Sequence, residues 1–224
     1  MRVTHSGQHE YDLDGVKLQE AHQEKDLGVE VSSTLKPSLQ CTKAAAKAMQ
    51  VLGIIKRNFV TQNKEDFRLL FDGYVRPHLE YCVQVWSPYL KDIECLEKVQ
   101  RRATKLVKGL KHKPYAERLA RLHTMSLEKR KTRGDLIQVF RILKGFDSVD
   151  TDHFFFELED GGGYRLRGHR LKLKVQRCQL QVRQNFFSVR IVNLWNKLPE
   201  SVVECSSVNV FKKRLDDWIA DVNF

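Results

Sequence analysis

Paired carboxylates are the residues from which a phosphoryl-transfer centre for two divalent ions would be built. The chain has a single Asp-Asp dipeptide, Asp216-Asp217. It falls in a segment with helical periodicity, so the two side chains point about 100° apart. The dipeptide also lacks the preceding aromatic residue of an aromatic-x-Asp-Asp loop. We therefore expect a solvated helix face at this point and predict no catalytic residue in the chain.

The histidines and cysteines do not form a metal-binding pattern. No cysteine pair has the spacing of a zinc knuckle or a redox CxxC, and an odd number of widely spaced cysteines is typical of reduced thiols inside a cell. We expect no metal, no cofactor, no signal peptide and no membrane span, and an intracellular protein. The residues concerned are His78, His112, His123, His153, His169, Cys41, Cys82, Cys95, Cys178 and Cys205.

Positive charge is the feature that points to a ligand. The net charge is +11 and the pI about 9.5, which favours polyanions, and nucleic acid before membrane. Residues 98–131 hold twelve Lys or Arg against two Glu, and residues 161–199 hold nine against no carboxylate. One charge run alone more often marks a solvated helix face, but two segregated blocks favour phosphate binding. The predicted contacts are Lys98, Arg101, Arg102, Lys105 and Lys108 in the first block, and Arg165, Arg167, Arg170, Lys172 and Lys174 in the second.

Helical segments are expected to position these residues, so the fold class is mainly α. An Asp14-Gly15 turn predicts a hairpin near the N-terminus, and a third short strand follows at 27–31. Helical spacing begins after Pro37, and Asn63 is placed to cap a second helix that Pro77 should kink or break. Further helices are predicted at 92–108, 115–122, 127–146, 186–198 and, capped by Ser207, to the end of the chain.

The change in composition at Asp147–Asp152 predicts a linker. It separates residues 1–34, the N-terminal strands, and 35–146, a helical bundle, from 153–224, a basic C-terminal region. Within that region, Arg165–Val175 alternates basic and apolar residues, which is typical of an exposed strand, arm or hairpin.

A string of short motifs follows the chain from Asp26 onward. The motifs are Asp26-Leu27-Gly28-Val29, Arg76-Pro77-His78-Leu79-Glu80-Tyr81, Val85-Trp86-Ser87-Pro88-Tyr89, Leu96–Thr104, Arg133-Gly134-Asp135-Leu136-Ile137, Arg165-x-Arg167-Gly168-His169, Asn185-Phe186-Phe187-Ser188-x-Arg190, Leu194-Trp195-Asn196-x-Leu198-Pro199, Phe211-Lys212 and Leu215-Asp216. In order and spacing, over nearly the whole chain, they resemble one protein family, the non-LTR retrotransposon reverse transcriptases of the jockey-like and chicken-repeat-like branch.

The resemblance covers the thumb and the downstream region of such a polymerase. Asp26, Leu27, Gly28 and Val29 match the strand that grips the primer. The resemblance implies that the fingers, most of the palm and the catalytic Asp-Asp loop are absent here, so it transfers no catalytic residue. It implies contacts with RNA or DNA instead, made by shape and charge without reading sequence.

Three functions remain open at this point. The first is a non-catalytic fragment of a retroelement polymerase that binds RNA or DNA. The second is a protein-interaction module that kept the helical scaffold, for which an exposed apolar patch would be the sign. The third is a translated remnant of a truncated insertion with no selected function.

Overall fold

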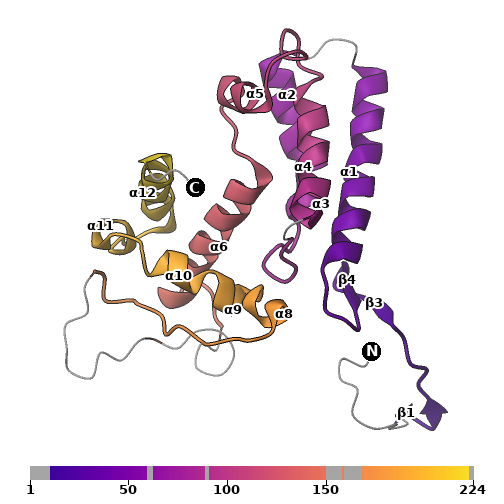
Figure 1. Ribbon diagram of the computed structural model, residues 1–224, viewed down its shortest axis with the longest axis vertical. Helices are drawn as coiled ribbons and strands as arrows, with labels where there is room; N and C mark the ends of the chain where they lie inside the picture. Colours follow the sequence, from indigo (N-terminus) through magenta and orange to yellow (C-terminus); the bar gives the residue numbers. More distant parts are fainter. Residues whose placement is uncertain (1–10, 60–62, 89–90, 150–157, 159–167, 222–224) are drawn as a thin grey trace. The chain divides into compact units, whose positions relative to one another are not determined.

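The computed structural model describes residues 11–59, 63–88, 91–149, 158 and 168–221. The chain is mainly α-helical, as the sequence predicted, with two small antiparallel hairpins near the N-terminus. The hairpin at Asp14-Gly15 was predicted, whereas the predicted third strand at 27–31 starts with the turn of a second hairpin. It divides into two compact units, which we call unit 1, residues 1–124, and unit 2, residues 125–224. Figure 1 shows the elements of both.

Two hairpins open unit 1, and both turn on two residues with positive φ. The first hairpin joins β1 to β2 through Asp14 and Gly15, whose φ values are 53° and 79°. The second joins β3 to β4 through Leu27 and Gly28 at 44° and 83°. Turns of this kind match the right-handed twist of the flanking strands, and they favour Asp-Gly. The strands are β1 Asp12–Leu13, β2 Val16–Lys17, β3 Gln23–Asp26 and β4 Val29–Ser32.

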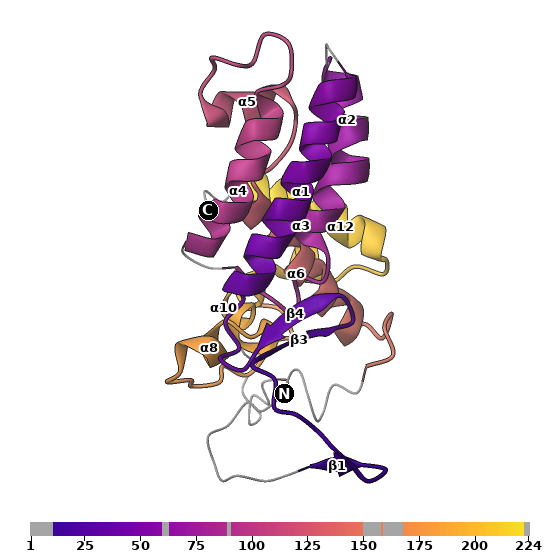
Figure 2. The ribbon, with the colours of Figure 1, turned by 90° about the vertical axis from the view of Figure 1, so that its right-hand side faces the viewer.

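Helices make up the rest of unit 1. The longest, α1, packs against α3 and lies beside α4 in both ribbon views (Figures 1 and 2). Its buried residues include Ala44, Ala45 and Ala48, and small side chains allow helices to approach closely. The helices are α1 Ser38–Asn58, α2 Lys64–Leu70, the π-helical η1 Phe71–Val75, α3 Arg76–Glu80, α4 Lys91–Thr104 and α5 Tyr115–Arg121.

Pro77 does not break the second predicted helix, which continues for three residues beyond it. The turn before it is π-helical, and the Arg76 N–H bonds to Phe71 O, five residues back. This wider turn leads into α3, where Pro77 occupies the first turn, a position that tolerates a missing N–H. The predicted cap is confirmed at the start of α2, because Asn63 Oδ1 accepts from the Asp66 N–H at 2.7 Å.

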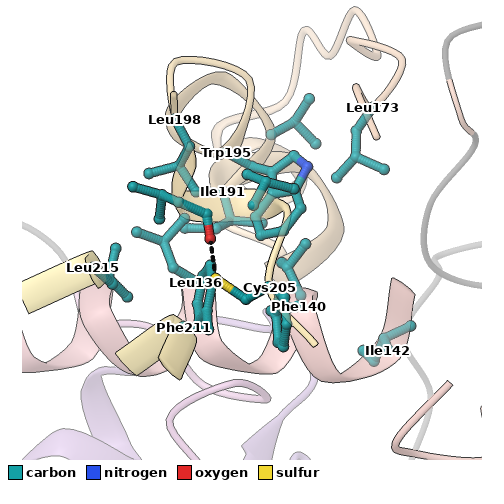
Figure 3. Packing of buried hydrophobic residues seen from close by; sticks show 14 of the residues in the cluster. Leu136, Phe140, Ile142, Leu173, Ile191, Trp195, Leu198, Cys205, Phe211 and Leu215 are labelled. Carbon is teal, nitrogen blue, oxygen red and sulfur yellow. Dashed lines mark hydrogen bonds between the residues drawn. The ribbon is translucent and has the colours of Figure 1, made fainter. Parts of the chain in front are cut away.

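Unit 2 is built around one apolar core, shown in Figure 3. Phe140 of α6 stacks on Phe211 of α12 with ring centroids 4.2 Å apart, and Trp195 of α10 is fully buried beside them. The helices are α6 Leu127–Leu143, α8 Gln181–Gln184, α9 Phe187–Arg190, α10 Val192–Trp195, α11 Glu200–Val203 and α12 Val208–Asp221.

Three features of unit 2 differ from the sequence prediction. Helix α6 belongs to this core, so the units divide after Thr124, whereas the predicted linker lay at Asp147–Asp152. The predicted helix 186–198 is two short helices, α9 and α10. The described part of Arg165–Val175 forms no strand, only a single bridge between Leu158 and Leu173.

Candidate nucleic-acid interface

The first basic block presents a row of exposed cations along α4. The helix buries Leu96, Val99 and Ala103 on one side. On the other side, Lys98 and Arg102 are exposed one turn apart. Lys105 and Lys108 are exposed just beyond the end of the helix. We call Lys98, Arg102, Lys105 and Lys108 the α4 cation row.

Within the described part of the chain, none of these four side chains forms an ion pair. Glu94, one turn before Lys98, pairs with Arg101 instead. Glu97, the residue next to Lys98, is buried and accepts a hydrogen bond from the Tyr115 hydroxyl. Four cations with no internal partner and a solvated environment can meet phosphate oxygens without breaking any contact of the fold.

The helix ends four residues earlier than the sequence predicted, at Thr104 instead of Lys108, because Arg118 reaches its last turn. Arg118 Nη1 donates to Arg101 O and to Thr104 Oγ1, each at 2.6 Å. In a continuing helix, Arg101 O would accept from the Lys105 N–H. That N–H bonds to Arg102 O at 3.2 Å instead. Lys105 and Lys108 therefore lie on a turn and not on the helix.

Arg101 was predicted as a phosphate contact, but its guanidinium is engaged within unit 1. Its Nη1 lies 2.8 Å from Glu94 Oε1, and its Cζ lies 5.1 Å from the centroid of the Tyr115 ring. The guanidinium of Arg118 lies over the same ring at 5.2 Å. Arg101 is thus held by an ion pair and a cation–π contact, and it does not belong to the α4 cation row.

A buried polar cluster under the row was not predicted from the sequence. Arg118 is 3 % exposed, and the Tyr115 hydroxyl donates to the buried carboxylate of Glu97. Burial, and then the bond to Glu97, raise the pKa of Tyr115, so the hydroxyl stays protonated. Burial lowers the pKa of Arg118. One feature of the sequence could have predicted this cluster. Glu97 follows Ile93 by four residues, so it lies on the apolar side of α4.

Among the residues of the second predicted block that the structure describes, we find no comparable row. Arg165 and Arg167 lie outside the described residues. Arg170 and Lys174 are exposed, but Lys172 Nζ donates to Asn196 O at 2.9 Å. Leu173, expected on the apolar side of a strand or arm, is fully buried in the unit 2 core.

Residues 168–174 dock on α10 through side-chain bonds to the backbone. Trp195 Nε1 donates to Leu171 O at 2.6 Å. The Asn196 side chain accepts from the Leu173 N–H at 2.9 Å and donates to Leu173 O at 2.8 Å. His169 is 1 % exposed, and its Nε2 lies 3.1 Å from Trp195 O. Burial lowers the pKa of His169, which stays neutral.

The residues whose sequence was compared with a primer grip form the tip of the second hairpin. Asp26 pairs with Val29, and Leu27 and Gly28 make the turn. The Tyr81 hydroxyl donates to Leu27 O at 2.9 Å. A Cβ at Gly28 would lie 3.4 Å from the Tyr81 ring and would need a positive φ, so glycine suits this position.

The described residues contain no group of three His, Cys, Asp or Glu that could hold a metal ion. In the same part of the chain, no helix is long and apolar enough to cross a membrane.

Asp216, expected on a solvated helix face, pairs with Arg133, whose Nη2 lies 2.9 Å from the Asp216 Oδ2.

Neither the family models, nor the curated proteins, nor the solved structures include a match to this chain.

Several motif residues of unit 2 contact one another across long sequence distances. Asp135 and Arg190, 55 residues apart, form a buried bidentate pair with two N–O distances of 3.0 Å. Burial raises the pKa of Asp135, and the guanidinium opposes that rise. Arg133 and Asp216, 83 residues apart, form a second pair. The two pairs connect α6 to α9 and to α12 within unit 2, and the Asp135–Arg190 pair is buried.

Proposed function

We propose that this chain binds RNA or DNA without reading its sequence, through phosphate contacts made by the α4 cation row. On this proposal the chain is a non-catalytic relative of the post-palm region of a retroelement polymerase. The motif resemblance supports the relationship. The observation that most supports nucleic-acid binding is that all four cations are exposed and unpaired within the described part of unit 1.

The side-chain types favour backbone contacts over base reading. Three members of the row are lysines, which act as point charges toward phosphate. The only arginine, Arg102, lies in the last turn of α4. A row of this kind meets the charge of any sequence, so affinity should depend steeply on salt and weakly on sequence.

A salt titration with matched variants tests the proposal. One variant replaces Lys98, Arg102, Lys105 and Lys108 with glutamine. The control replaces Lys47, Lys56, Lys64 and Arg68, which are equally exposed residues of α1 and α2. Both variants lose three lysines and one arginine, so a difference between them reports the location of the charge and not its amount.

For the row variant, we expect the log–log salt slope of affinity to become shallower by about 3, at ~0.7–0.9 per phosphate contact. The control should lose far less. An equal loss in both variants would show that binding follows net charge alone, and a flat titration of the unaltered chain would refute the proposal.

A second measurement addresses the expected lack of polymerase activity. Purified chain supplied with magnesium, primer, template and nucleotides should incorporate none, because paired carboxylates at a metal site are required for that reaction. Incorporation above the level of a blank preparation would contradict the non-catalytic part of the proposal.

A further inference from the structure

Two phenylalanines that follow one another in unit 2 lie in opposite surroundings. Phe187, the first residue of α9, is 7 % exposed and belongs to the unit 2 core, whereas Phe186 is 44 % exposed. The first ring anchors α9, and the second is presented to solvent. A single exposed phenylalanine is ordinary on a protein surface, so its surroundings decide whether it can hold a ligand.

The guanidinium of Arg183 lies over the Phe186 ring, with its Cζ 5.2 Å from the ring centroid. Among the residues that the structure describes, Phe186 has no other ring or cation contact. Because nearly half of the side chain stays exposed, a flat ligand can reach the ring beside this arginine.

The backbone around the ring is fixed by hydrogen bonds, and α8 contacts α9 directly (Figure 1). The Phe186 N–H bonds to Arg183 O at 3.1 Å, and Arg183 Nη2 donates to Gln176 Oε1 at 3.2 Å. On the other side, Arg190 Nη1 donates to Asn185 O at 2.9 Å. The ring is therefore held in place before a ligand arrives, which lowers the entropy cost of binding.

The charge around the ring is positive. Arg177 and Arg183 are exposed, and in the ranges that the structure describes neither has a carboxylate partner. Residues 161–199 contain no carboxylate at all, and Asp135 is bound by Arg190. An anionic ligand at Phe186 thus meets no acid of this stretch, and charge complementarity favours one.

We propose that Arg177, Arg183 and Phe186, which we call the Phe186 platform, hold an unpaired base of single-stranded RNA or DNA. The base stacks on the Phe186 ring, and the two arginines meet the phosphates on either side of it. In a duplex the faces of the bases are covered by their neighbours, so the platform selects single strands.

Stacking accepts any base, because every base has a flat aromatic face. The platform therefore agrees with binding that does not read sequence. This inference rests on the proposed function, since both require affinity for nucleic acid, and it adds the class of nucleic acid that the chain prefers.

A cycle of changes in the protein and in the nucleic acid tests the platform on the full chain. One ligand is oligothymidylate, and the other is an abasic strand of the same length, which keeps the phosphates but has no bases. The unaltered chain should bind the abasic strand about 5- to 150-fold more weakly, the range for one stacked base. Phe186→Leu keeps an apolar side chain without a ring, so it should bind both strands equally.

Two variants serve as controls. Phe59→Leu removes a phenylalanine at the end of α1 that is 47 % exposed, and it should keep the full preference for the strand with bases. Phe186→Tyr keeps an aromatic ring and should keep that preference too. The salt slope should be the same for Phe186→Leu and the unaltered chain, because no phosphate contact is removed.

Equal affinity of the unaltered chain for the two strands would overturn the proposal, and so would equal effects of Phe186→Leu and Phe59→Leu. A Phe186-dependent affinity for phosphatidylserine vesicles without any dependence on bases would identify a lipid surface as the partner and would also overturn it.

Failure of the platform and failure of the α4 cation row give different results. A chain with no affinity for any strand refutes both. Binding that the row variant leaves unchanged but that needs the Phe186 ring refutes the row and supports the platform. Binding that the row variant weakens but that ignores the bases does the reverse.

Discussion

In unit 1 the side chains of the α4 cation row end in solvent, whereas in unit 2 Lys172 and Arg190 bind protein oxygens. Residues 161–199 contain no carboxylate. The structure shows that this does not leave all of their cations unpaired. Lys172 binds a backbone carbonyl, and Arg190 binds Asp135, which lies outside the stretch.

Local charge balance therefore says little about whether a cation is available to a ligand. What matters is the set of oxygens that folding brings to it. On α4, Glu94 pairs with Arg101 and Glu97 accepts from Tyr115, and the neighbouring cations stay unpaired.

The largest effect is expected when the buried pair in unit 2 is broken. Arg190→Met should lower the free energy of unfolding of unit 2 by about 3–5 kcal/mol, because it leaves the Asp135 carboxylate buried without its guanidinium. Native-state hydrogen exchange of α6 and α10 measures this loss, with the amides of α1 as the internal reference.

Arg102→Met is the matched control, because it removes an exposed arginine of α4 and should cost less than about 0.5 kcal/mol. If Arg190→Met and Arg102→Met lowered the free energy of unfolding equally, the two basic blocks would not differ as we expect. A double variant, Arg190→Met with Asp135→Leu, should recover much of the stability, since neither buried charge then remains.

A smaller effect is expected from acid. His169 is neutral in the fold because burial lowers its pKa, and the Trp195 carbonyl, Lys172 and Glu200 modify that shift. A lowered folded pKa contributes stability above the unfolded value, near 6.5, and this stability is lost as pH falls through the folded value. Unit 2 should therefore weaken on acidification.

The variant His169→Gln keeps a donor for Trp195 O and does not titrate. Hydrogen exchange of residues 169–174 and α10 should depend less on pH in this variant than in the unaltered chain. Identical pH profiles for the two proteins would show that His169 does not contribute to the acid sensitivity.

The smallest effects give the sharpest test of the contrast. Lys172→Met should cost unit 2 about 1 kcal/mol of stability, because a hydrogen bond to Asn196 O is lost, and should leave nucleic-acid affinity nearly unchanged. Lys105→Met should do the reverse: stability stays the same, and the salt slope of affinity becomes shallower by roughly 0.7–0.9. The expectation fails if both variants change the same property.

Local sequence signals located several features correctly. Asp14-Gly15 makes the first hairpin, Asn63 caps α2, and Ser207 lies at the start of α12, where its Oγ accepts from the Val210 N–H at 3.3 Å. These features depend on residues within three positions of each other. Backbone preference and short-range hydrogen bonds decide them.

Features that depend on distant residues were misjudged. The end of α4 at Thr104 depends on Arg118, fourteen residues further along the chain. The grouping of α6 with unit 2 depends on Phe211, 71 positions after Phe140 along the chain. No periodicity in a single segment carries this information.

The amino-acid sequence by itself determined the mainly helical class, the surplus of positive charge and the turn of the first hairpin, because each follows from composition or from neighbouring residues. Only the tertiary structure decided which cations remain free. An arginine or lysine is available to phosphate when no carboxylate, carbonyl or ring reaches it, and those partners come from elements far away along the chain.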